Sequence, residues 1–203
     1  MIINVFEKIL NIKIVYYGPA LSGKTTSFTS LCDHFGLKDK VTNIENTVDR
    51  TLFFDYGIIT FQNQQWTLKI YLYSTTGQDF YKVTRPITLK GVDGVFFIVN
   101  SQENAFERNL ISWFELYDLF KDSIKNLPMV VCFNKQDLPE KFPPKLFLKE
   151  IEKFSLKSMD IKYTIASNGE GILLSFERML ELIFQNLIND GLLKSATLRC
   201  AES

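Results

Sequence analysis

The sequence predicts a single α/β domain, in which helices cover both faces of a mostly parallel sheet that includes one antiparallel hairpin strand. Three observations support this prediction. Short apolar runs alternate with segments of helical periodicity along the chain. Residues 95–99 and 129–133 are apolar throughout, as expected for strands that are covered on both faces. The chain has 203 residues, which is enough for one domain with a sizeable core.

The first predicted elements are a strand and a helix on either side of a glycine-rich loop. Residues 12–17 form a short apolar run that ends at Gly18, which predicts a buried strand. A helix is expected from residue 25 to about residue 35, and Gly36 is its expected end. Residues 37–49 are polar and irregular, which predicts a long loop.

Two strands are then predicted to form a hairpin. Residues 51–61 and 66–74 have strand composition and flank Asn63-Gln64. Apolar and polar side chains alternate in the second strand, so one of its faces should be more exposed than the other. The alternating apolar residues are Leu68, Ile70 and Leu72.

The second half of the chain continues the alternation of strands and helices. Residues 77–90 are predicted as mixed loop and helix, a helix is expected near residues 144–154, and a strand near residues 161–166. Two further helices are predicted from apolar side chains at helical spacing. The first carries Phe106, Leu110, Phe114 and Tyr117, and the last carries Ile172, Phe176, Leu180, Ile183 and Leu187, with Gly191 as its expected end.

Composition narrows the class of protein. Basic and acidic residues each number 23, so the chain has no net charge, which argues against a broad nucleic-acid or membrane surface. No run reaches transmembrane length, and no secretory signal is visible. The 3 cysteines lack metal-ligand spacing and fit reduced thiols in a cytoplasm. One domain is expected over residues 1–203, with residues 1–10 as an N-terminal extension or extra strand and residues 191–203 as a flexible tail.

A phosphate-binding pattern, G-x-x-x-x-G-K-[ST], follows the first strand. In such a loop backbone N–H groups wrap a phosphate at the start of a helix, the lysine neutralises the β- and γ-phosphates, and the next hydroxyl binds Mg²⁺. The alternative is an ordinary strand–turn–helix corner with a surface lysine. The residues that we assign to nucleotide binding are Gly18, Pro19, Ala20, Leu21, Ser22, Gly23, Lys24, Thr25 and Thr26, with Lys24 also catalytic and Thr25 also a metal ligand.

The sequence N-K-Q-D at residues 134–137 follows a predicted strand and indicates guanine specificity. The Asp137 carboxylate can accept two hydrogen bonds from the guanine edge, whereas adenine would leave it unpaired. Asn134 can tie the base-binding loop together, and the stem of Lys135 can cover the ring. Without the upstream phosphate loop, this string would be interpreted as a polar turn. A second base loop should follow the last strand and offer a backbone N–H to guanine O6; its residues are Ala166 and Ser167.

These residues, in this order, resemble those of the Ras-like small GTPases, and they are most similar to the bacterial MglA-type polarity and gliding-motility branch. The resemblance runs from Asn11 to the last helix and thins in residues 37–47 and in the tail. It implies a Ras-like P-loop NTPase fold, which is a three-layer sandwich. The segments that carry the MglA-type likeness are residues 13–19, 21–26, 50–55, 77–78, 80–81 and 89–94.

The resemblance implies a molecular switch that is on with GTP, off with GDP, and dependent on Mg²⁺. Thr51 aligns with the threonine that reaches Mg²⁺, Gln78 with the glutamine that orients the attacking water, and Arg50 with an arginine supplied in cis. Gly77 would offer a backbone N–H to the γ-phosphate. Thr47 is a rival to Thr51. Arg50 and Gln78 have the alternatives of an exposed loop cation and a polar turn residue.

Two positions depart from the Ras-like pattern. Ser74 stands where an aspartate usually holds a Mg²⁺-bound water; MglA-type proteins likewise have a hydroxyl there, and weaker Mg²⁺ binding is expected. Ala20 stands where glycine is usual, and its methyl group is expected to crowd the transition state without preventing binding. Alanine would also be strained if the position required a positive φ. We therefore expect binding with slow hydrolysis. The alternative is a nucleotide-loaded scaffold with negligible hydrolysis, while the guanine motif disfavours an ATP-dependent kinase.

The resemblance also implies partners. A roadblock-fold, MglB-type homodimer is expected to act as the activating protein and to contact the two switch segments. Residues 52–56 and 80–81 are candidate contacts, although their aromatic side chains have the alternative of packing in the sheet core. Polarity or motility proteins are the expected effectors, and nucleic acid is not expected to bind. The domain is expected to be a monomer in the cytoplasm that partners recruit to a cell pole or to the inner membrane face.

Overall fold

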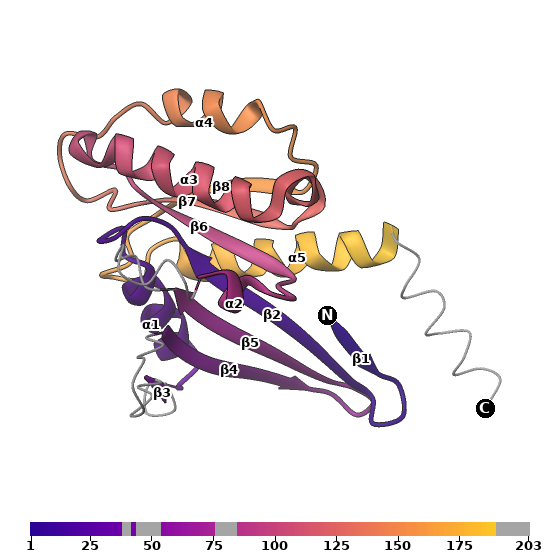
Figure 1. The fold of residues 1–203 in the computed structure, drawn as a ribbon. Helices are drawn as coiled ribbons and strands as arrows, with labels where there is room; N and C mark the ends of the chain where they lie inside the picture. The colour runs from indigo at the N-terminus through magenta and orange to yellow at the C-terminus, as the bar shows by residue number, and fades with distance from the viewer. Residues whose placement is uncertain (38–41, 44–53, 76–84, 190–203) are drawn as a thin grey trace, which may run out of the picture.

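The structure, a computed structural model, describes residues 1–37, 42–43, 54–75 and 85–189. These residues form an 8-stranded sheet in the order β3-β4-β5-β2-β6-β7-β8, with β1 paired to β2 outside this path (Figure 1). The strands are β1 (Ile2–Asn4), β2 (Ile9–Tyr17), β3 (Thr42–Asn43), β4 (Phe54–Gln62), β5 (Thr67–Thr75), β6 (Gly94–Asn100), β7 (Met129–Asn134) and β8 (Met159–Thr164). The α-helices are α1 (Lys24–His34), α2 (Arg85–Leu89), α3 (Phe106–Phe120), α4 (Pro144–Glu152) and α5 (Ile172–Asn189), with 3₁₀ turns η3 (Glu103–Ala105) and η4 (Lys121–Asn126) beside α3.

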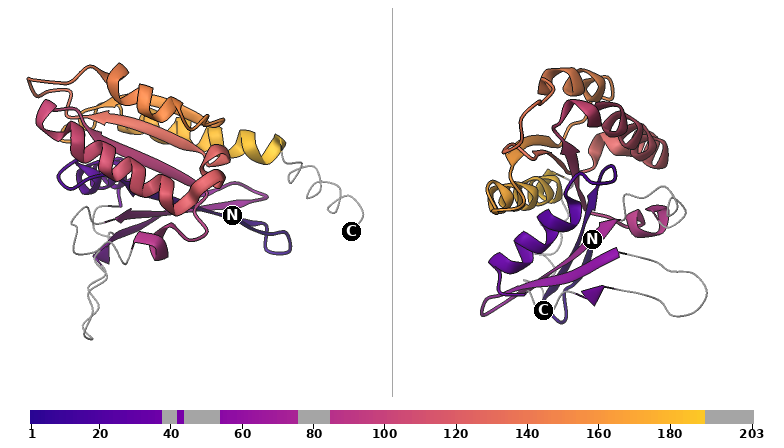
Figure 2. Two further views of the ribbon diagram at one scale, coloured as in Figure 1. Left: turned by 45° about the horizontal axis from the view of Figure 1, so that its top comes forward. Right: turned by 90° about the vertical axis from the view of Figure 1, so that its left-hand side faces the viewer.

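Helices cover both faces of the sheet, as Figures 1 and 2 show, so the expected three-layer α/β architecture is confirmed. One apolar cluster lies between the sheet and the pair α1 and α5, and the other lies between the sheet and α2, α3 and α4. Side chains of β2 alternate between these clusters, because successive strand residues point to opposite faces. Ile14 and Tyr16 belong to the first cluster, whereas Val15 and Tyr17 belong to the second.

The pairing of β2 places the glycine-rich loop at a crevice. β2 pairs in parallel with β5 on one side and with β6 on the other. The strand order therefore reverses at β2, because its two parallel neighbours lie on opposite sides of it. Ligands of α/β proteins bind at such a point. β6, β7 and β8 continue in parallel, so the loops after β2, β7 and β8 emerge at the same edge.

Antiparallel pairs lie at the β3 side of the sheet and at the start of β2. β4 and β5 form the predicted hairpin, closed where the Asn63 N–H donates to the Trp66 carbonyl oxygen at 3.0 Å. β1 pairs antiparallel with the start of β2, which begins at Ile9, three residues before the predicted strand. β3 lies inside the segment predicted as loop and pairs antiparallel with β4.

The apolar stripe predicted for α3 lies beside its buried face. The buried residues of this helix are Asn109, Ser112, Trp113 and Leu116, whereas Phe114 is 41% exposed. Periodicity located the helix but not the centre of the face that it buries, because two polar side chains occupy that face. The expected end of the last helix at Gly191 lies outside the described residues.

No helix in the described parts of the chain is both long and apolar enough to span a bilayer.

Candidate functional site

The glycine-rich loop runs from the end of β2 to the start of α1, and both of its pattern glycines are required by their surroundings. Gly18 has φ +142°, and a Cβ there would collide with the backbone carbonyl oxygen of Ile98 on β6. Gly23 has φ +96°, and a Cβ there would collide with the amide nitrogen of Asn134. Only glycine therefore allows this loop to approach β6 and the β7 loop so closely.

The loop carries its backbone strain at Leu21. Leu21 has φ +61° and a side chain that is 76% exposed. Ala20 is not among the non-glycine residues with positive φ. The condition for strain at position 20, a positive φ, is therefore not met, because the left-handed turn falls one residue later. The steric part of the expectation, crowding by the Ala20 methyl group, does not depend on φ.

Lys24 is a buried cation at the start of α1. It is 5% exposed, and its Nζ donates to the carbonyl oxygens of Pro19 at 2.7 Å and Gly18 at 3.0 Å. Burial, followed by the nearby Arg85 cation, lowers the pKa of Lys24 to about 7, against the opposing effect of Asp55. A desolvated ammonium held over its own loop is ready to pair with an anion.

The first turn of α1 offers further donors to an anion. Gly23 is its N-cap and provides no side-chain cap, and the turn contains no acidic residue. The first N–H groups of a helix lack intrahelical acceptors and carry a partial positive charge. Together with Lys24, this helix start is suited to phosphate.

One buried amide connects the glycine-rich loop to the loops after β7 and β8. Asn134 is 1% exposed, and its Nδ2 donates to the Ser22 carbonyl oxygen at 2.8 Å. Its Oδ1 accepts from Thr164 Oγ1 at 3.1 Å and from the Ala166 N–H at 3.0 Å. The Ala166 N–H, predicted to face guanine O6, is thus bonded to Asn134 here.

The N-K-Q-D segment turns sharply after β7. Lys135 is half-buried with φ +66°, and Asp137 is exposed. Gln136, the unassigned position of the motif, donates through Nε2 to Ser101 Oγ at 2.8 Å, and its N–H bonds the Thr164 carbonyl oxygen at 3.3 Å. Gln136 therefore fixes this loop to the ends of β6 and β8. A residue that the motif leaves variable gave no sequence signal for this role.

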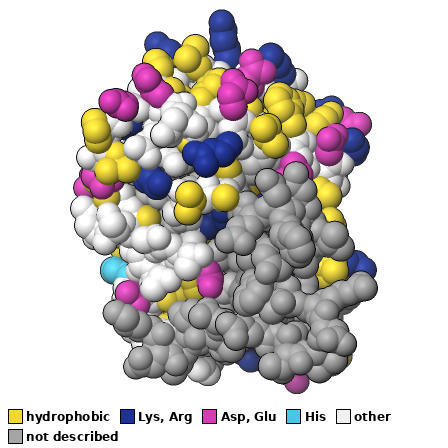
Figure 3. Space-filling view, turned by 60° about the vertical axis from the view of Figure 1, so that its left-hand side comes forward, with side chains coloured by type: hydrophobic (Ala, Val, Ile, Leu, Met, Phe, Trp, Pro, Cys, Tyr) yellow, Lys and Arg dark blue, Asp and Glu magenta, His cyan; other side chains and the backbone are white. Residues whose placement is uncertain are grey.

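A cavity of about 490 Å³ opens between α1 and the loop before α5. Its volume is in the range of small-molecule sites. Acidic and basic side chains are mixed over the described part of this end of the molecule (Figure 3). The residues that line the cavity include Thr26, Asp33, His34, Ala166, Ser167 and Ile172. His34 thus lines the same cavity as three predicted site residues, Thr26, Ala166 and Ser167.

Several predicted site residues lie outside the described residues. They are Thr47, Arg50, Thr51, Gly77 and Gln78, together with Leu52, Phe53, Phe80 and Tyr81 of the candidate partner contacts. Of the remaining candidates for the metal region, Thr25 is exposed at the start of α1 and Ser74 is 2% exposed near the end of β5. The Ser74 hydroxyl makes no hydrogen bond to the described residues.

The described residues fit a magnesium–nucleotide complex better than a metal bound by protein alone. They contain no group of three or more His, Cys, Asp and Glu side chains able to hold a metal ion. Mg²⁺ commonly takes one or two protein ligands and completes its shell with phosphate and water. The free Ser74 hydroxyl and the exposed Thr25 suit that arrangement.

Comparison with known proteins agrees with this geometry. The model of the ADP-ribosylation factor (Arf) family matches residues 1–183. The mutual gliding-motility protein MglA of Myxococcus xanthus (strain DK1622) is 32% identical over 200 residues, covering 93% of this chain and 98% of that protein. The Ras-related protein Rab-5B of Plasmodium falciparum (isolate 3D7) is 23% identical over 174 residues, covering 85% and 78%. The chain therefore belongs to the Arf family of Ras-like small GTPases, which in general bind GTP and GDP with Mg²⁺ and hydrolyse GTP.

Proposed function

We propose that this chain is a guanine-nucleotide switch that hydrolyses GTP slowly until a partner accelerates it. The observation that carries the proposal is the Asn134 amide, which bonds the phosphate loop through Ser22 and the second base loop through Ala166. One buried side chain thereby fixes the distance between the phosphate end and the base end of a nucleotide site.

The roles at the base follow from the chemistry of guanine. Asp137 is exposed and would accept from guanine N1–H and the 2-amino group, and the half-buried stem of Lys135 would cover the ring. Guanine O6 would compete with the Asn134 Oδ1 for the Ala166 N–H. Adenine would leave the carboxylate unpaired.

The roles at the phosphates follow from the loop. Backbone N–H groups between Pro19 and Thr25 would surround the β-phosphate. Lys24 would exchange its bonds to the Gly18 and Pro19 carbonyl oxygens for bonds to phosphate oxygens. Thr25 and Thr51 are the proposed protein ligands of Mg²⁺, which supplies positive charge at the β- and γ-phosphates. We keep Gln78, Arg50 and Lys24 as the proposed hydrolysis residues, and Gly77 as the proposed N–H donor to the γ-phosphate.

The proposed partners rest on the resemblance to MglA-type GTPases and on the similarity to the Myxococcus protein. The name of the Myxococcus protein refers to gliding motility. We extend a role in cell polarity or motility to this chain, with a roadblock-fold, MglB-type protein as its activator. The proposed location is the cytoplasm, with recruitment by partners to a pole or to the inner membrane face.

The second candidate is a scaffold that holds GTP with negligible hydrolysis. It is favoured by Ala20, whose methyl group stands in the phosphate loop, and by Ser74, which brings no charge to the metal region. A large increase in the GTP hydrolysis rate of Ala20→Gly would show that the residues for hydrolysis are present and that the Ala20 methyl group slows them. No increase would support the scaffold.

Single-turnover hydrolysis of preloaded GTP with excess Mg²⁺ tests the proposal, with and without a roadblock-fold protein. Slow decay that the partner accelerates supports the switch. Retention of GTP in both conditions supports the scaffold. Equal affinity for GDP and ADP would overturn the guanine assignment itself, and the Asp137→Asn variant should then show no shift toward xanthine nucleotides.

A further inference from the structure

A partly buried ion pair joins α2 to α3 beside the phosphate loop. Arg85 is the first residue of α2 and is 4% exposed. Its Nη1 donates to Glu115 Oε2, which lies on α3 with a side chain that is 24% exposed. Neither residue belongs to the phosphate or guanine motifs. The pair therefore needs an explanation of its own, because a buried guanidinium is costly to desolvate.

The same guanidinium also lies over an aromatic ring. The Arg85 Cζ is 5.8 Å from the centroid of the Tyr17 ring. A guanidinium near an aromatic face is attracted to the ring, and more strongly when both are shielded from water. Tyr17 is the last residue of β2 and is followed directly by Gly18. Glu115, Arg85 and Tyr17 thus form a continuous set of contacts from α3 to the entrance of the phosphate loop.

Charge supports the same connection. After burial, the Arg85 cation is the larger of the neighbouring influences on the pKa of Lys24. Burial and then the Glu115 carboxylate raise the pKa of Tyr17, while Arg85 opposes them. Arg85 therefore lies within electrostatic reach of Lys24 as well as of Glu115 and Tyr17.

We infer that Glu115 and Arg85 are positioning residues for the phosphate loop: α3 holds the guanidinium against Tyr17 and so restrains the strand end that enters the loop. The effect on nucleotide rests on the proposed function, whereas the restraint of the loop does not. Glu115 lies on α3 and not in the phosphate loop. An event on α3 that displaces this carboxylate would therefore weaken nucleotide binding without contacting the nucleotide.

Glu115→Gln tests the inference, because an amide keeps the size and an acceptor oxygen but removes the charge that holds Arg85. The first readout is hydrogen–deuterium exchange of residues 17–24 in the nucleotide-free chain, which should become faster. The second is dissociation of a fluorescent GDP analogue, which should accelerate roughly threefold to thirtyfold, the usual size of such couplings. Glu107→Gln, an exposed change on the same helix, is the matched control and should alter neither readout.

A pair of Tyr17 variants keeps the test decisive if the α3 variant does not fold. Tyr17→Phe retains the ring under the guanidinium and should behave as the unmodified chain, whereas Tyr17→Leu removes the ring and should reproduce the loosened loop. If Glu115→Gln and Tyr17→Leu both showed the same exchange rates as the Glu107→Gln control, the inference would be overturned. If the unmodified chain does not bind the GDP analogue, the proposed function fails, and the exchange comparison still decides the restraint.

Discussion

Asp55 and Ser74 lie opposite each other in the antiparallel pair of β4 and β5. Directly opposed residues point to the same face of a sheet. Ser74 is also the register partner of Tyr16 in β2, whose ring packs edge-on against Phe28 of α1, so this is the α1 face. The Asp55 carboxylate is near enough to Lys24 to favour its charged form. A carboxylate thus stands across from the position where Ras-like proteins carry their aspartate.

We predict that Asp55 replaces part of the metal-region charge that Ser74 lacks. Asp55→Asn should raise the Mg²⁺ concentration that half-maximally slows GDP dissociation by about tenfold, the usual cost of removing an outer-shell group. Adding Ser74→Asp to that variant should restore the original Mg²⁺ dependence, because it returns a carboxylate to the same face. If Asp55→Asn showed the same Mg²⁺ dependence of GDP dissociation as the unmodified chain, the prediction would be contradicted. This measurement does not require GTP hydrolysis.

The pattern glycines should tolerate a methyl group far less well than a glycine in open space. Gly18→Ala would drive Cβ into the Ile98 carbonyl, which belongs to a central strand and cannot move away. Gly36 also has a positive φ, +66°, but a Cβ there meets nothing within 4 Å. Gly36→Ala should therefore cost only about 1 kcal/mol of unfolding free energy, from the left-handed backbone alone. Gly18→Ala should cost several times more. Urea unfolding of the two nucleotide-free variants measures the loss of unfolding free energy in each. Equal losses would contradict the predicted collision of the Gly18→Ala methyl group with Ile98.

Neighbouring loop residues should respond to glycine with opposite signs. Leu21→Gly should stabilise the nucleotide-free chain by roughly 0.5 kcal/mol, because the strain relieved at φ +61° exceeds the cost of the freedom that the unfolded chain gains, and the lost side chain is mostly exposed. Ala20→Gly should destabilise it by roughly 0.5–1 kcal/mol, because the unfolded chain gains freedom and no strain is relieved. Thermal unfolding of both variants without nucleotide gives the comparison. If only Ala20→Gly stabilised the chain, the backbone strain would lie at Ala20 and not at Leu21, which would contradict the prediction.

Sequence patterns located the parts of this molecule that depend on local spacing. The continuous apolar runs became β6 and β7, and the glycine pattern became the loop between β2 and α1. Contacts that depend on long-range register were not visible. Asp55 meets Ser74 only because the hairpin closes at Asn63, and Arg85 meets Glu115 only because α2 packs beside α3. No local pattern specifies which distant side chain will be opposite.

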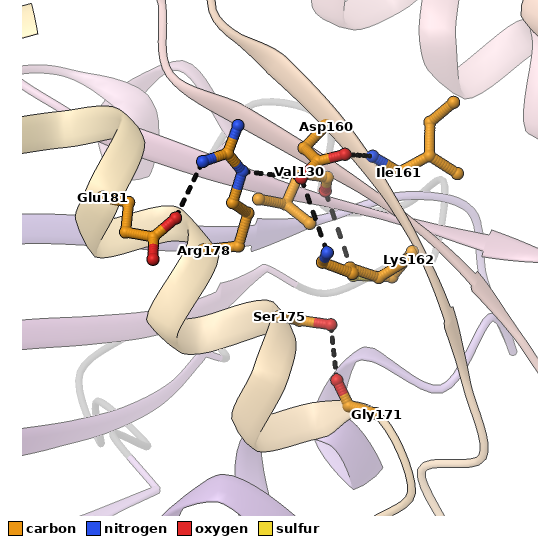
Figure 4. Close-up of polar contacts among 9 residues, drawn as sticks. Val130, Asp160, Ile161, Lys162, Gly171, Ser175, Arg178 and Glu181 are labelled. Carbon is orange, nitrogen blue, oxygen red and sulfur yellow. Dashed lines mark hydrogen bonds and ion pairs between the residues drawn. The ribbon is translucent and has the colours of Figure 1, made fainter. Parts of the chain in front are cut away.

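The charged side chains between α5 and β8 should contribute a small, pH-dependent part of the stability. Arg178 donates from α5 to Asp160 on the edge strand at 2.6 Å and to Glu181 at 2.7 Å (Figure 4). Burial acts to raise the pKa of Asp160, but the Ile161 N–H and the Arg178 guanidinium more than offset it and lower the pKa. A carboxyl whose pKa is lowered in the folded state stabilises the fold fully at pH values above its unfolded-state pKa, which is near 4. It loses that contribution as the pH falls through the lowered folded-state pKa.

Asp160→Asn should therefore cost less than about 1 kcal/mol near pH 7, as is usual for partly exposed pairs. The difference from the unmodified chain should shrink toward zero as the pH falls through the lowered pKa of Asp160. Urea unfolding at neutral pH and near pH 3 measures both values. A difference that stays constant between these conditions would show that the variant acts through packing and not through charge.

Asn134 should be the most sensitive polar residue of the site. Asn134→Ala leaves the Ser22 carbonyl, the Thr164 hydroxyl and the Ala166 N–H without their shared partner. Buried groups left unpaired cost about 1–3 kcal/mol each when water cannot reach them, so a total loss of about 2–4 kcal/mol is expected after partial relaxation. The loss should appear in urea unfolding without nucleotide, because the ties exist within the protein. Asn104→Ala, an exposed change in η3, is the control and should alter stability by less than about 0.5 kcal/mol. If Asn134→Ala instead unfolds like the control and only weakens GDP, then the amide serves the base directly and does not set the spacing of the loops.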